Sequence, residues 1–206
     1  KKIKNADAVL ISHMRGHTSD MDVILSECKQ ANIPLIEDAA HSLGTTWHGK
    51  NIGTLGDIGC FSFQSYKMLN AGEGGIFITD DPELFAKAVI MSGAYEHNWM
   101  KHQGDQVYFK KWQNKLPLYN LRMNNLSAAL INAQLPELGS RVQKGRLNHD
   151  FTAERLDKSP WISVPAKLEP EQRAPDSIQF NLVDMNSTEI DLFEEITSGS
   201  GLNVQI

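Results

Sequence analysis

The sequence predicts an α/β fold with a mostly parallel sheet, and three observations carry that prediction. Residues 8–12 form an apolar run of strand length, and a segment with helical spacing follows before a second strand opens at Pro34. A strand–helix–strand unit of this kind implies two parallel strands joined by a right-handed crossover. Two further apolar runs, at 58–63 and 75–79, extend the sheet and enclose a glycine-rich turn.

The elements around this sheet have clear start and stop signals. Asp20 offers an N-cap to a helix that ends near Asn32. The apolar residues of this helix recur at helical spacing and are Met21, Ile24, Leu25 and Cys28. Residues 47–53 are typical of a turn or short hairpin, and Pro82 at a first-turn position starts a helix over 83–91.

The middle of the chain is less regular. Residues 92–118 are rich in aromatic, histidine and lysine side chains without a clear period, which predicts an irregular excursion facing a substrate or another subunit. Asn124 or Asn125 then caps a long helix. The apolar stripe of that helix consists of Leu126, Ala129, Leu130, Ala133 and Leu135. Pro136 kinks this helix or separates it from the next one.

We expect two domains. Residues 1–139 are predicted to form a large domain that is incomplete at its amino-terminal end. Residues 140–206 are predicted to form a linking helix and part of a small α+β C-terminal domain. This second part is expected to contain, in order, a charged helix at 140–157, a proline-rich loop at 158–176, a strand at 178–184, a helix at 189–197 and a strand at 202–206.

Composition excludes several classes of partner. The chain has 206 residues, a net charge of −5 and a pI of about 5.8, with 41% hydrophobic and 22% charged residues. These values are ordinary for a globular protein, and an acidic chain without a Lys/Arg block is not expected to bind nucleic acid. No apolar run reaches the length of a membrane span, and the first residues lack the apolar core of a signal peptide. We therefore expect a cytoplasmic protein in which Cys28 and Cys60 are free thiols.

The turn between the strands at 58–63 and 75–79 contains the most informative chemistry. It carries Lys67 and ends in the glycine-rich sequence 72–75, which permits close backbone approach. A lysine between two strands is costly as a cation, so it becomes useful if its amine stays neutral or is consumed in a Schiff base. The strand that opens at Pro34 ends in Asp38. A carboxylate and a later lysine are what pyridoxal 5'-phosphate (PLP) needs, one for its pyridinium nitrogen and one for its aldehyde.

Each polar residue near this turn has a second interpretation. The hydroxyl of Ser62 and the amide of Gln64 can bind a cofactor phosphate, but both residues can also face outward by simple strand alternation. Asp38 can be a strand-end cap, and Lys67 can be a surface residue of a hairpin turn. Asp38 and His41 have the spacing of half a metal site, but no further ligands follow at convincing spacing, so no metal is expected.

Several motifs, in this order and spacing, resemble a known enzyme family. They are Glu-Asp-Ala-Ala-His-Ser-Leu-Gly at 37–44, Gly-Thr-Leu-Gly-Asp-Ile-Gly-Cys-Phe-Ser-Phe at 53–63, Lys67 with Gly-Glu-Gly-Gly at 72–75, and Tyr-Asn-Leu-Arg-Met-Asn-Asn-Leu-Ser-Ala-Ala at 119–129. These motifs resemble those of the DegT-type sugar aminotransferases, which are PLP enzymes with the aspartate aminotransferase fold. The resemblance runs from about Ala8 to about Leu138, and it implies the PLP-dependent transferase fold type I.

The resemblance implies a role for most of the candidate residues. Lys67 is expected to be the catalytic residue, which holds PLP and then moves a proton between the substrate carbon and the cofactor. His41 is expected near the cofactor ring or its phenolic oxygen, although many relatives have glutamine there. The candidate cofactor-binding residues are Asp38, His41, Ser62, Gln64, Lys67 and Asn120.

Asn120 resembles the family asparagine that reaches the PLP phosphate of the neighbouring subunit, which implies a homodimer with shared active sites. Leu118 departs from the family pattern, in which glycine is usual at that position. Arg122 is expected to brace this loop rather than to contact substrate. Family members also carry a substantial segment before residue 1 and further chain after residue 206, so we expect an internal portion of a longer enzyme.

The predicted function is a PLP-dependent aminotransferase that moves an amino group from glutamate or glutamine to a keto sugar nucleotide or a keto-cyclitol. One alternative is a PLP-dependent sugar dehydratase, but those relatives carry histidine in place of the lysine at position 67. A second alternative is a non-catalytic regulatory protein with a PLP-enzyme fold. A third, a nucleotide-binding α/β module, lacks a phosphate-loop fingerprint at residues 12–16, after the first strand.

Overall fold

The computed structural model describes residues 3–93, 95, 97–202 and 204. The chain divides into two compact units. The first contains Lys1–Arg146 together with Lys167–Asp176, and the second contains Leu147–Ala166 together with Ser177–Ile206. The domain limits 1–139 and 140–206 stay a prediction.

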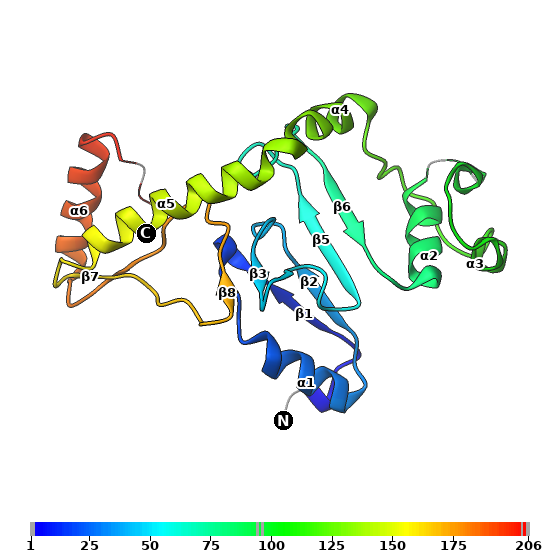
Figure 1. The fold of residues 1–206 in the computed structure, drawn as a ribbon, viewed down its shortest axis with the longest axis horizontal. Helices are drawn as coiled ribbons and strands as arrows, with labels where there is room; N and C mark the ends of the chain where they lie inside the picture. The colour runs from blue at the N-terminus through cyan, green and yellow to red at the C-terminus, as the bar shows by residue number, and fades with distance from the viewer. Residues whose placement is uncertain (1–2, 94, 96, 203, 205–206) are drawn as a thin grey trace. The chain divides into compact units, whose positions relative to one another are not determined.

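A four-stranded sheet forms the centre of the first unit (Figure 1). Its strands are β1 (Val9–Ser12), β2 (Leu35–Asp38), β5 (Ile58–Ser62) and β6 (Gly75–Ile78), in the order β1-β2-β5-β6. The first three are parallel and β6 is antiparallel to β5, as Figure 1 shows by the direction of its arrows. The predicted α/β fold with a mostly parallel sheet is therefore confirmed. In the aligned register, Ser12 lies opposite Asp38, which in turn lies opposite Cys60.

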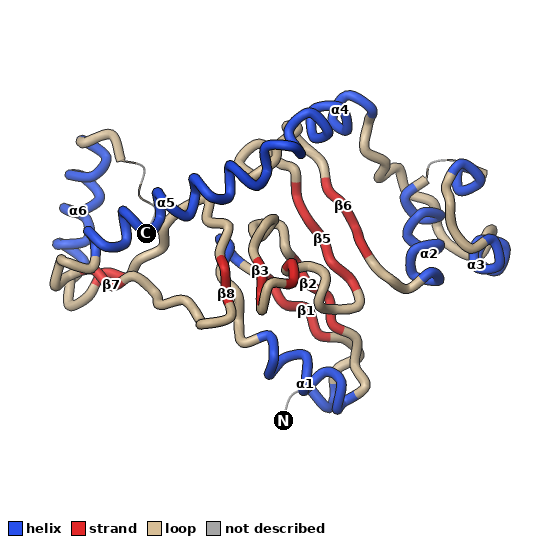
Figure 2. The backbone as a smooth tube through the Cα atoms, in the orientation of Figure 1, coloured by secondary structure: helices blue, strands red, loops and turns tan. Residues whose placement is uncertain are grey.

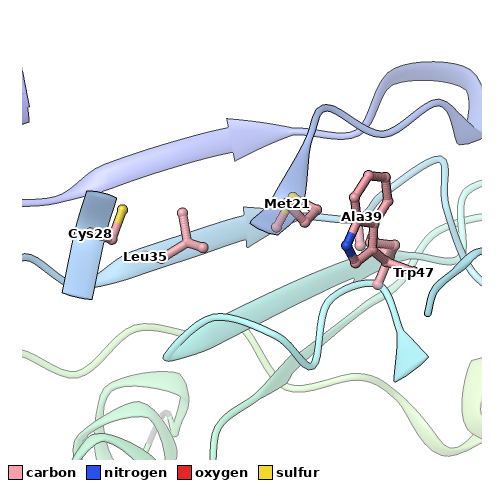
Figure 3. Packing of buried hydrophobic residues seen from close by; sticks show 6 residues of the cluster. Met21, Cys28, Leu35, Ala39 and Trp47 are labelled. Carbon is pink, nitrogen blue, oxygen red and sulfur yellow. The ribbon is translucent and has the colours of Figure 1, made fainter. Parts of the chain in front are cut away.

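Helix α1 (Met21–Ala31) makes the crossover from β1 to β2. The Asp20 side chain accepts a hydrogen bond from Val23 N, and Asn32 ends the helix with a left-handed φ of 52°, so both predicted helix ends are confirmed. The buried apolar face of α1 joins a core cluster on the sheet. That cluster comprises Met21, Cys28, Leu35, Ala39, Trp47 and Ile52. Figure 3 shows Met21 close to Ala39 and Trp47, and Cys28 beside Leu35.

The predicted hairpin is present as β3 (Thr46–Trp47) and β4 (Lys50–Asn51). Strand β8 (Glu171–Gln172) pairs with β3, so that Thr46 lies opposite Gln172. The prediction of a proline-rich loop over 158–176 is therefore wrong at this point. A strand of two polar residues is too short to show a sequence period. Its extended conformation is imposed by pairing with β3.

Residues 92–118 are more ordered than the sequence predicts. Helix α2 (Pro82–Ser92) is followed by a 3-10 helix (Asn98–Lys101) and by α3 (Gln106–Trp112). These elements share a buried cluster of Ala86, Val89, Ile90, Trp99 and Phe109. The rings of Trp99 and Phe109 stack with their centroids 5.3 Å apart. Tertiary packing of a few aromatic residues therefore organises a segment that has no local periodicity.

Helix α4 (Asn125–Gln134) begins as predicted, because the Asn124 side chain accepts a hydrogen bond from Ser127 N at 2.8 Å. The face of α4 that is buried differs from the predicted stripe. Ser127 and Ile131 are buried, whereas Leu126 is 72% exposed. A 3-10 turn (Leu135–Glu137) that contains Pro136 then separates α4 from α5 (Leu138–Leu156), as predicted.

The second unit contains β7 (Ile162–Ser163), β9 (Asn181–Leu182) and α6 (Ser187–Gly199) (Figure 2). Strands β7 and β9 are antiparallel, and Asn186 forms a capping box with Glu189 at the start of α6. The predicted strand at 178–184 shortens to β9. The predicted strand at 202–206 includes positions 203, 205 and 206, which lie outside the described residues.

Two short 3-10 helices complete the described elements, at Ile3–Asn5 and Met14–Gly16. A search of the described residues for a helix with the length and apolar character of a membrane span found none.

Candidate active site

The candidate site lies where the parallel strands β1, β2 and β5 end. The Asp38 carboxylate is fixed at this edge, because its Oδ2 accepts a hydrogen bond from Ser12 Oγ at 2.8 Å and its Oδ1 accepts one from Ala40 N at 3.1 Å. Both oxygens keep a further lone pair for a ligand. Ligands of open α/β sheets bind at the carboxyl ends of the strands, so the position of Asp38 suits a binding role.

The turn that carries Lys67 is held by its own polar groups. Gln64 accepts two hydrogen bonds, at its backbone oxygen from Lys67 N at 2.9 Å and at its side-chain Oε1 from Tyr66 N at 3.0 Å. Ser65 N donates to Gly72 O, which closes the turn against the glycine-rich segment. The side-chain oxygen of Gln64 therefore shapes the lysine turn, while the predicted binding of a phosphate by Gln64 stays a prediction.

Lys67 lies against a histidine and a carboxylate. Its Nζ is 2.8 Å from His41 Nε2, and His41 Nδ1 is 3.5 Å from Asp176 Oδ2. The second distance is within the range of an ion pair, but Nδ1 has no hydrogen-bond partner among the described residues. These side chains line a small cavity, which has room for about one water molecule. The residues around the cavity are Ala40, His41, Leu43, Ser62, Lys67, Met68, Ala174 and Asp176.

Burial and neighbouring charges act in opposite directions on Lys67. Desolvation lowers the pKa of the Lys67 amine, the carboxylates of Asp176 and Asp38 raise it, and Arg15 lowers it. The net result is a lowered pKa, which favours the neutral, nucleophilic form of the amine.

The remaining donors also fit PLP by their chemistry. Ser62 Oγ accepts a hydrogen bond from Gln64 N at 3.2 Å, which leaves the hydroxyl proton available to an acceptor such as a phosphate oxygen. A lysine with a lowered pKa, a carboxylate at the strand edge and a hydroxyl donor are the groups that the aldehyde, pyridinium nitrogen and phosphate of PLP require.

Asn120 is not brought to this cavity. It is exposed and lies between two backbone contacts to the end of α2, Tyr119 N to Met91 O at 2.7 Å and Leu121 N to Ser92 O at 3.0 Å. These contacts fix the backbone on both sides of Asn120, whose side chain lies on the surface.

Arg122 donates from Nη1 to Asn98 Oδ1 at 3.4 Å, which agrees with the predicted bracing role. Its guanidinium also lies 5.6 Å from the centroid of the Tyr95 ring. Both partners belong to the segment between α2 and α3, so Arg122 joins that segment to the loop before α4.

Glu37 is an important residue that the sequence reasoning missed. Its fully buried carboxylate accepts hydrogen bonds from His13 Nε2 at 3.2 Å and from the backbone N–H groups of Gly53, Leu55 and Gly56 at 2.7–2.9 Å. Desolvation would raise the pKa of Glu37, but these four donors outweigh it and lower that pKa. The available signal was an acidic residue inside an otherwise buried strand.

Asp176 was also missed, and its sequence context gives no signal. It is a single aspartate in the proline-rich segment that was predicted to be a loop. Only the return of residues 167–176 to the first unit brings it to Lys67.

The described residues contain no group of three or more His, Cys, Asp or Glu side chains placed to hold a metal ion. Cys28 and Cys60 are both free. Burial is the main cause that raises the pKa of both thiols, with a smaller contribution from nearby carboxylates. Neither cysteine therefore has the lowered pKa of a reactive thiol.

Known proteins are similar to this chain in sequence and fold. The DegT/DnrJ/EryC1/StrS aminotransferase family matches residues 2–197. GDP-perosamine synthase of Escherichia coli O157:H7 is 35% identical over 168 residues, which cover 81% of this chain and 43% of that protein. The crystal structure of 3-amino-5-hydroxybenzoic acid synthase aligns with a TM-score of 0.78 at 25% identity, over 95% of this chain and 49% of that one.

A third protein shows the same fold with a different activity. The E. coli GDP-4-keto-6-deoxy-D-mannose-3-dehydratase with bound hydrated PLP aligns with a TM-score of 0.81 at 22% identity, over 96% of this chain and 52% of that one. This chain thus spans about half the length, or less, of the relatives that it matches. These likenesses confirm fold type I of the PLP-dependent transferases. With a family match over nearly its whole length, the chain belongs to the DegT/DnrJ/EryC1/StrS aminotransferase family.

Proposed function

We propose that this chain is the lysine-bearing portion of a PLP-dependent aminotransferase that moves an amino group from glutamate or glutamine to a keto sugar nucleotide or a keto-cyclitol. The observation that carries the proposal is Lys67, whose amine has a lowered pKa and lies 2.8 Å from His41 at the carboxyl edge of the sheet. Membership of an aminotransferase family and the similarity to GDP-perosamine synthase support it.

PLP, when bound, supplies an electron sink for the negative charge that develops on the substrate carbon. With PLP present, Lys67 would hold the cofactor through its amine, and the freed amine would move a proton from the substrate carbon to the cofactor side. Desolvation in the cavity favours this role, because a cationic lysine neither attacks an aldehyde nor accepts a proton.

The other residues of the site would hold and orient the cofactor. Ser12 and Ala40 hold the Asp38 carboxylate in a fixed position, where it would pair with the ring nitrogen of PLP. Ser62 would donate its hydroxyl proton to the phosphate, with the side-chain amide of Gln64 as a second donor. His41, which lies 2.8 Å from the lysine amine, would contact the ring or its phenolic oxygen.

We further propose a homodimer, because Asn120 is exposed and away from the cavity of its own chain. An exposed asparagine on a segment fixed to α2 suits a contact with the phosphate of a neighbouring subunit. Mixing full-length Lys67→Ala and Asn120→Ala subunits tests this arrangement. In a shared-site dimer one heterodimer site carries both changes and the other carries neither, so part of the activity returns. Verified subunit exchange without any return of activity contradicts the proposal.

The cytoplasm is the proposed location. Cys28 and Cys60 are free in the structure, and a reducing compartment keeps such thiols unpaired.

A sugar dehydratase is the second candidate function, supported by the fold similarity to GDP-4-keto-6-deoxy-D-mannose-3-dehydratase. Lys67 favours the aminotransferase, because an amine at this position can both hold the cofactor and move the proton during amino transfer. Product analysis with a keto sugar nucleotide and glutamate separates the two functions: an aminated product is expected, whereas a deoxygenated keto product supports the dehydratase.

The direct test uses the full-length protein purified with PLP. Borohydride reduction followed by peptide mapping is expected to place the cofactor label on Lys67. Lys50, an exposed lysine in the β3–β4 hairpin, provides the matched control, since Lys50→Ala should leave both the visible absorbance and the label unchanged. A yellow protein that carries the label on another lysine overturns the assignment.

A further inference from the structure

We propose that Asp176 is a positioning residue for Lys67, because it holds the proton of His41 on Nδ1 so that Nε2 accepts a hydrogen bond from the lysine amine. This inference rests on the proposed function only for the chemical role of Lys67. The contacts from Asp176 to His41 and from His41 to Lys67 are properties of the chain itself.

The two ring nitrogens of His41 face different partners. Nε2 is 2.8 Å from Lys67 Nζ, and Nδ1 is 3.5 Å from Asp176 Oδ2. A carboxylate attracts an N–H and repels a lone pair, so Asp176 favours the proton on Nδ1. Nε2 then presents a lone pair, and the lysine amine is the donor across the 2.8 Å contact.

Burial strengthens this preference. Only 21% of the His41 side chain and 18% of the Asp176 side chain are exposed, so the carboxylate acts through a partly desolvated space. Nδ1 lacks a hydrogen-bond partner among the described residues, and the Asp176 carboxylate lies 3.5 Å from it. The contact at 3.5 Å is electrostatic rather than a standard hydrogen bond.

Asp176 is held in place by a frame within the first unit. Ala174 N donates to Thr45 Oγ1 at 2.9 Å, and Thr18 N donates to Glu171 Oε1 at 2.9 Å. The Arg146 guanidinium donates to the carbonyl of Arg173. Segment 171–176 is therefore attached to three other parts of the first unit, at Thr45, Thr18 and Arg146.

Glycines allow this segment to lie close to its neighbours. A Cβ at Gly145 would lie 2.7 Å from Pro175 O, and a Cβ at Gly16, where φ is +82°, would lie 3.1 Å from Ala174 O. The backbone that precedes Asp176 thus packs directly against two other segments. Such packing limits how far the Asp176 carboxylate can move from His41.

The arrangement has a chemical consequence for the lysine. When His41 accepts one N–H of the neutral amine, the direction of the nitrogen lone pair is fixed away from the ring. Arg15, Asp38 and Asp176 are the charged groups that act on the Lys67 amine, and His41 is its hydrogen-bond partner. Asp176 acts on Lys67 directly and also lies 3.5 Å from His41, the hydrogen-bond partner of the lysine amine.

The tautomer of His41 is the first test. Full-length, cofactor-free protein labelled with 15N-histidine is compared with Asp176→Ala by the 15N shifts of the imidazole nitrogens, with His41→Gln used to assign the signals. The proton is expected on Nδ1 in the parent protein and is expected to shift toward Nε2 in Asp176→Ala. Asp22→Asn is the control, because Asp22 pairs with exposed His48 at 2.9 Å outside the site. It should leave the His41 signals unchanged.

The pKa of Lys67 is the second test, measured as the pH profile of its acetylation in the cofactor-free protein. Asp176 raises the pKa of Lys67, so Asp176→Asn should lower that pKa further. A purely structural role predicts the opposite direction, because loosening of the cavity would hydrate Lys67 and raise its pKa. Asp176→Asn keeps the size of the side chain, and it serves as the test if Asp176→Ala does not fold.

The third test measures kcat and KM of the full-length enzyme with PLP bound. Both Asp176 variants should lose about ten- to 100-fold in kcat, with little change in KM for the amino donor, as for a displaced catalytic group. Unchanged His41 tautomer, or a Lys67 pKa that rises in Asp176→Asn, overturns the role of Asp176. If the borohydride label still falls on Lys67, only this inference has failed, whereas a label elsewhere defeats the proposed function instead.

Discussion

Two neighbouring residues of β2, Glu37 and Asp38, belong to two very different regions of the sheet. Glu37 is fully buried and receives four hydrogen bonds, from His13 and from the turn at 53–56. Asp38 points to the other side of the strand, as successive strand residues do, and lies at the edge where Lys67 is found. The Glu37 carboxylate is saturated by its four donors. Each region also contains a histidine whose Nδ1 lacks a hydrogen-bond partner among the described residues, but His13 is 1% exposed, whereas His41 lines the cavity that holds the desolvated amine of Lys67.

The Glu37 region therefore serves the stability of the fold, and the Lys67 cavity serves its chemistry. Hydrogen bonds that saturate a buried carboxylate fix the turn at 53–56 against β2, and breaking them leaves buried groups unsatisfied. The cavity, by contrast, holds groups whose unmet interactions are available to a ligand. The following predictions test whether the two regions can be disturbed independently.

The largest effect is expected from Lys67→Ala. Because the amine both holds the cofactor and moves the proton, loss of the proton-transfer role alone should reduce transamination by roughly 10²–10⁴-fold. The free energy of unfolding should stay the same or rise, because the lowered pKa shows that the folded state disfavours the lysine cation. Steady-state kinetics and urea unfolding of the full-length protein measure both, with Lys50→Ala as the control. A large loss of stability would show that Lys67 is a structural residue.

Glu37→Gln should give the opposite result, with a large loss of stability. The amide group keeps one acceptor oxygen but turns an NH2 toward backbone N–H donors, so at least one buried donor loses its partner. A loss of about 3 kcal/mol in the free energy of unfolding is expected. Glu27→Gln changes an exposed glutamate of α1 and should stay within about 0.5 kcal/mol. Equal effects of the two substitutions would remove Glu37 from its structural role.

The pH dependence of stability should follow Glu37. Its pKa is lower in the folded state than in the unfolded chain, so its stabilisation is present above the unfolded pKa. That stabilisation is lost as the pH falls through the lowered pKa of the folded state. The difference in unfolding free energy between the parent protein and Glu37→Gln should therefore shrink in acid. A difference that is constant between pH 3 and pH 7 would contradict the linkage.

Local sequence signals predicted the elements that have their own period or cap. The crossover helix between Asp20 and Asn32, the hairpin at 47–53 and the start of α4 at Asn124 all have such signals, and the structure confirms them. The lysine turn was also predictable, because the apolar runs at 58–63 and 75–79 and the glycine-rich sequence at 72–75 mark its limits. These features depend on residues that are close in sequence.

The features that sequence reasoning missed depend on distant partners. Strand β8 forms because β3 offers its edge, and α3 is stabilised by the stacking of Phe109 on Trp99. The contact of Asp176 with His41 joins residues that are far apart in the chain. No periodicity or cap can report such pairings, since each one is created by the folded chain around it.

The smallest effect is expected from Thr45→Val, which acts on the frame that joins the two regions. Thr45 Oγ1 is buried, accepts a hydrogen bond from Ala174 N at 2.9 Å and donates to Gly16 O at 3.4 Å. Valine has nearly the same shape but leaves the Ala174 N–H without a partner, so about 2 kcal/mol of stability should be lost. Thr45→Ser keeps the hydroxyl and removes one methyl group, which should cost about 1 kcal/mol. Urea unfolding of both variants decides the matter: a serine variant as unstable as the valine variant would mean that packing of the methyl group, and not the hydrogen bond to Ala174, holds the segment that ends in Asp176.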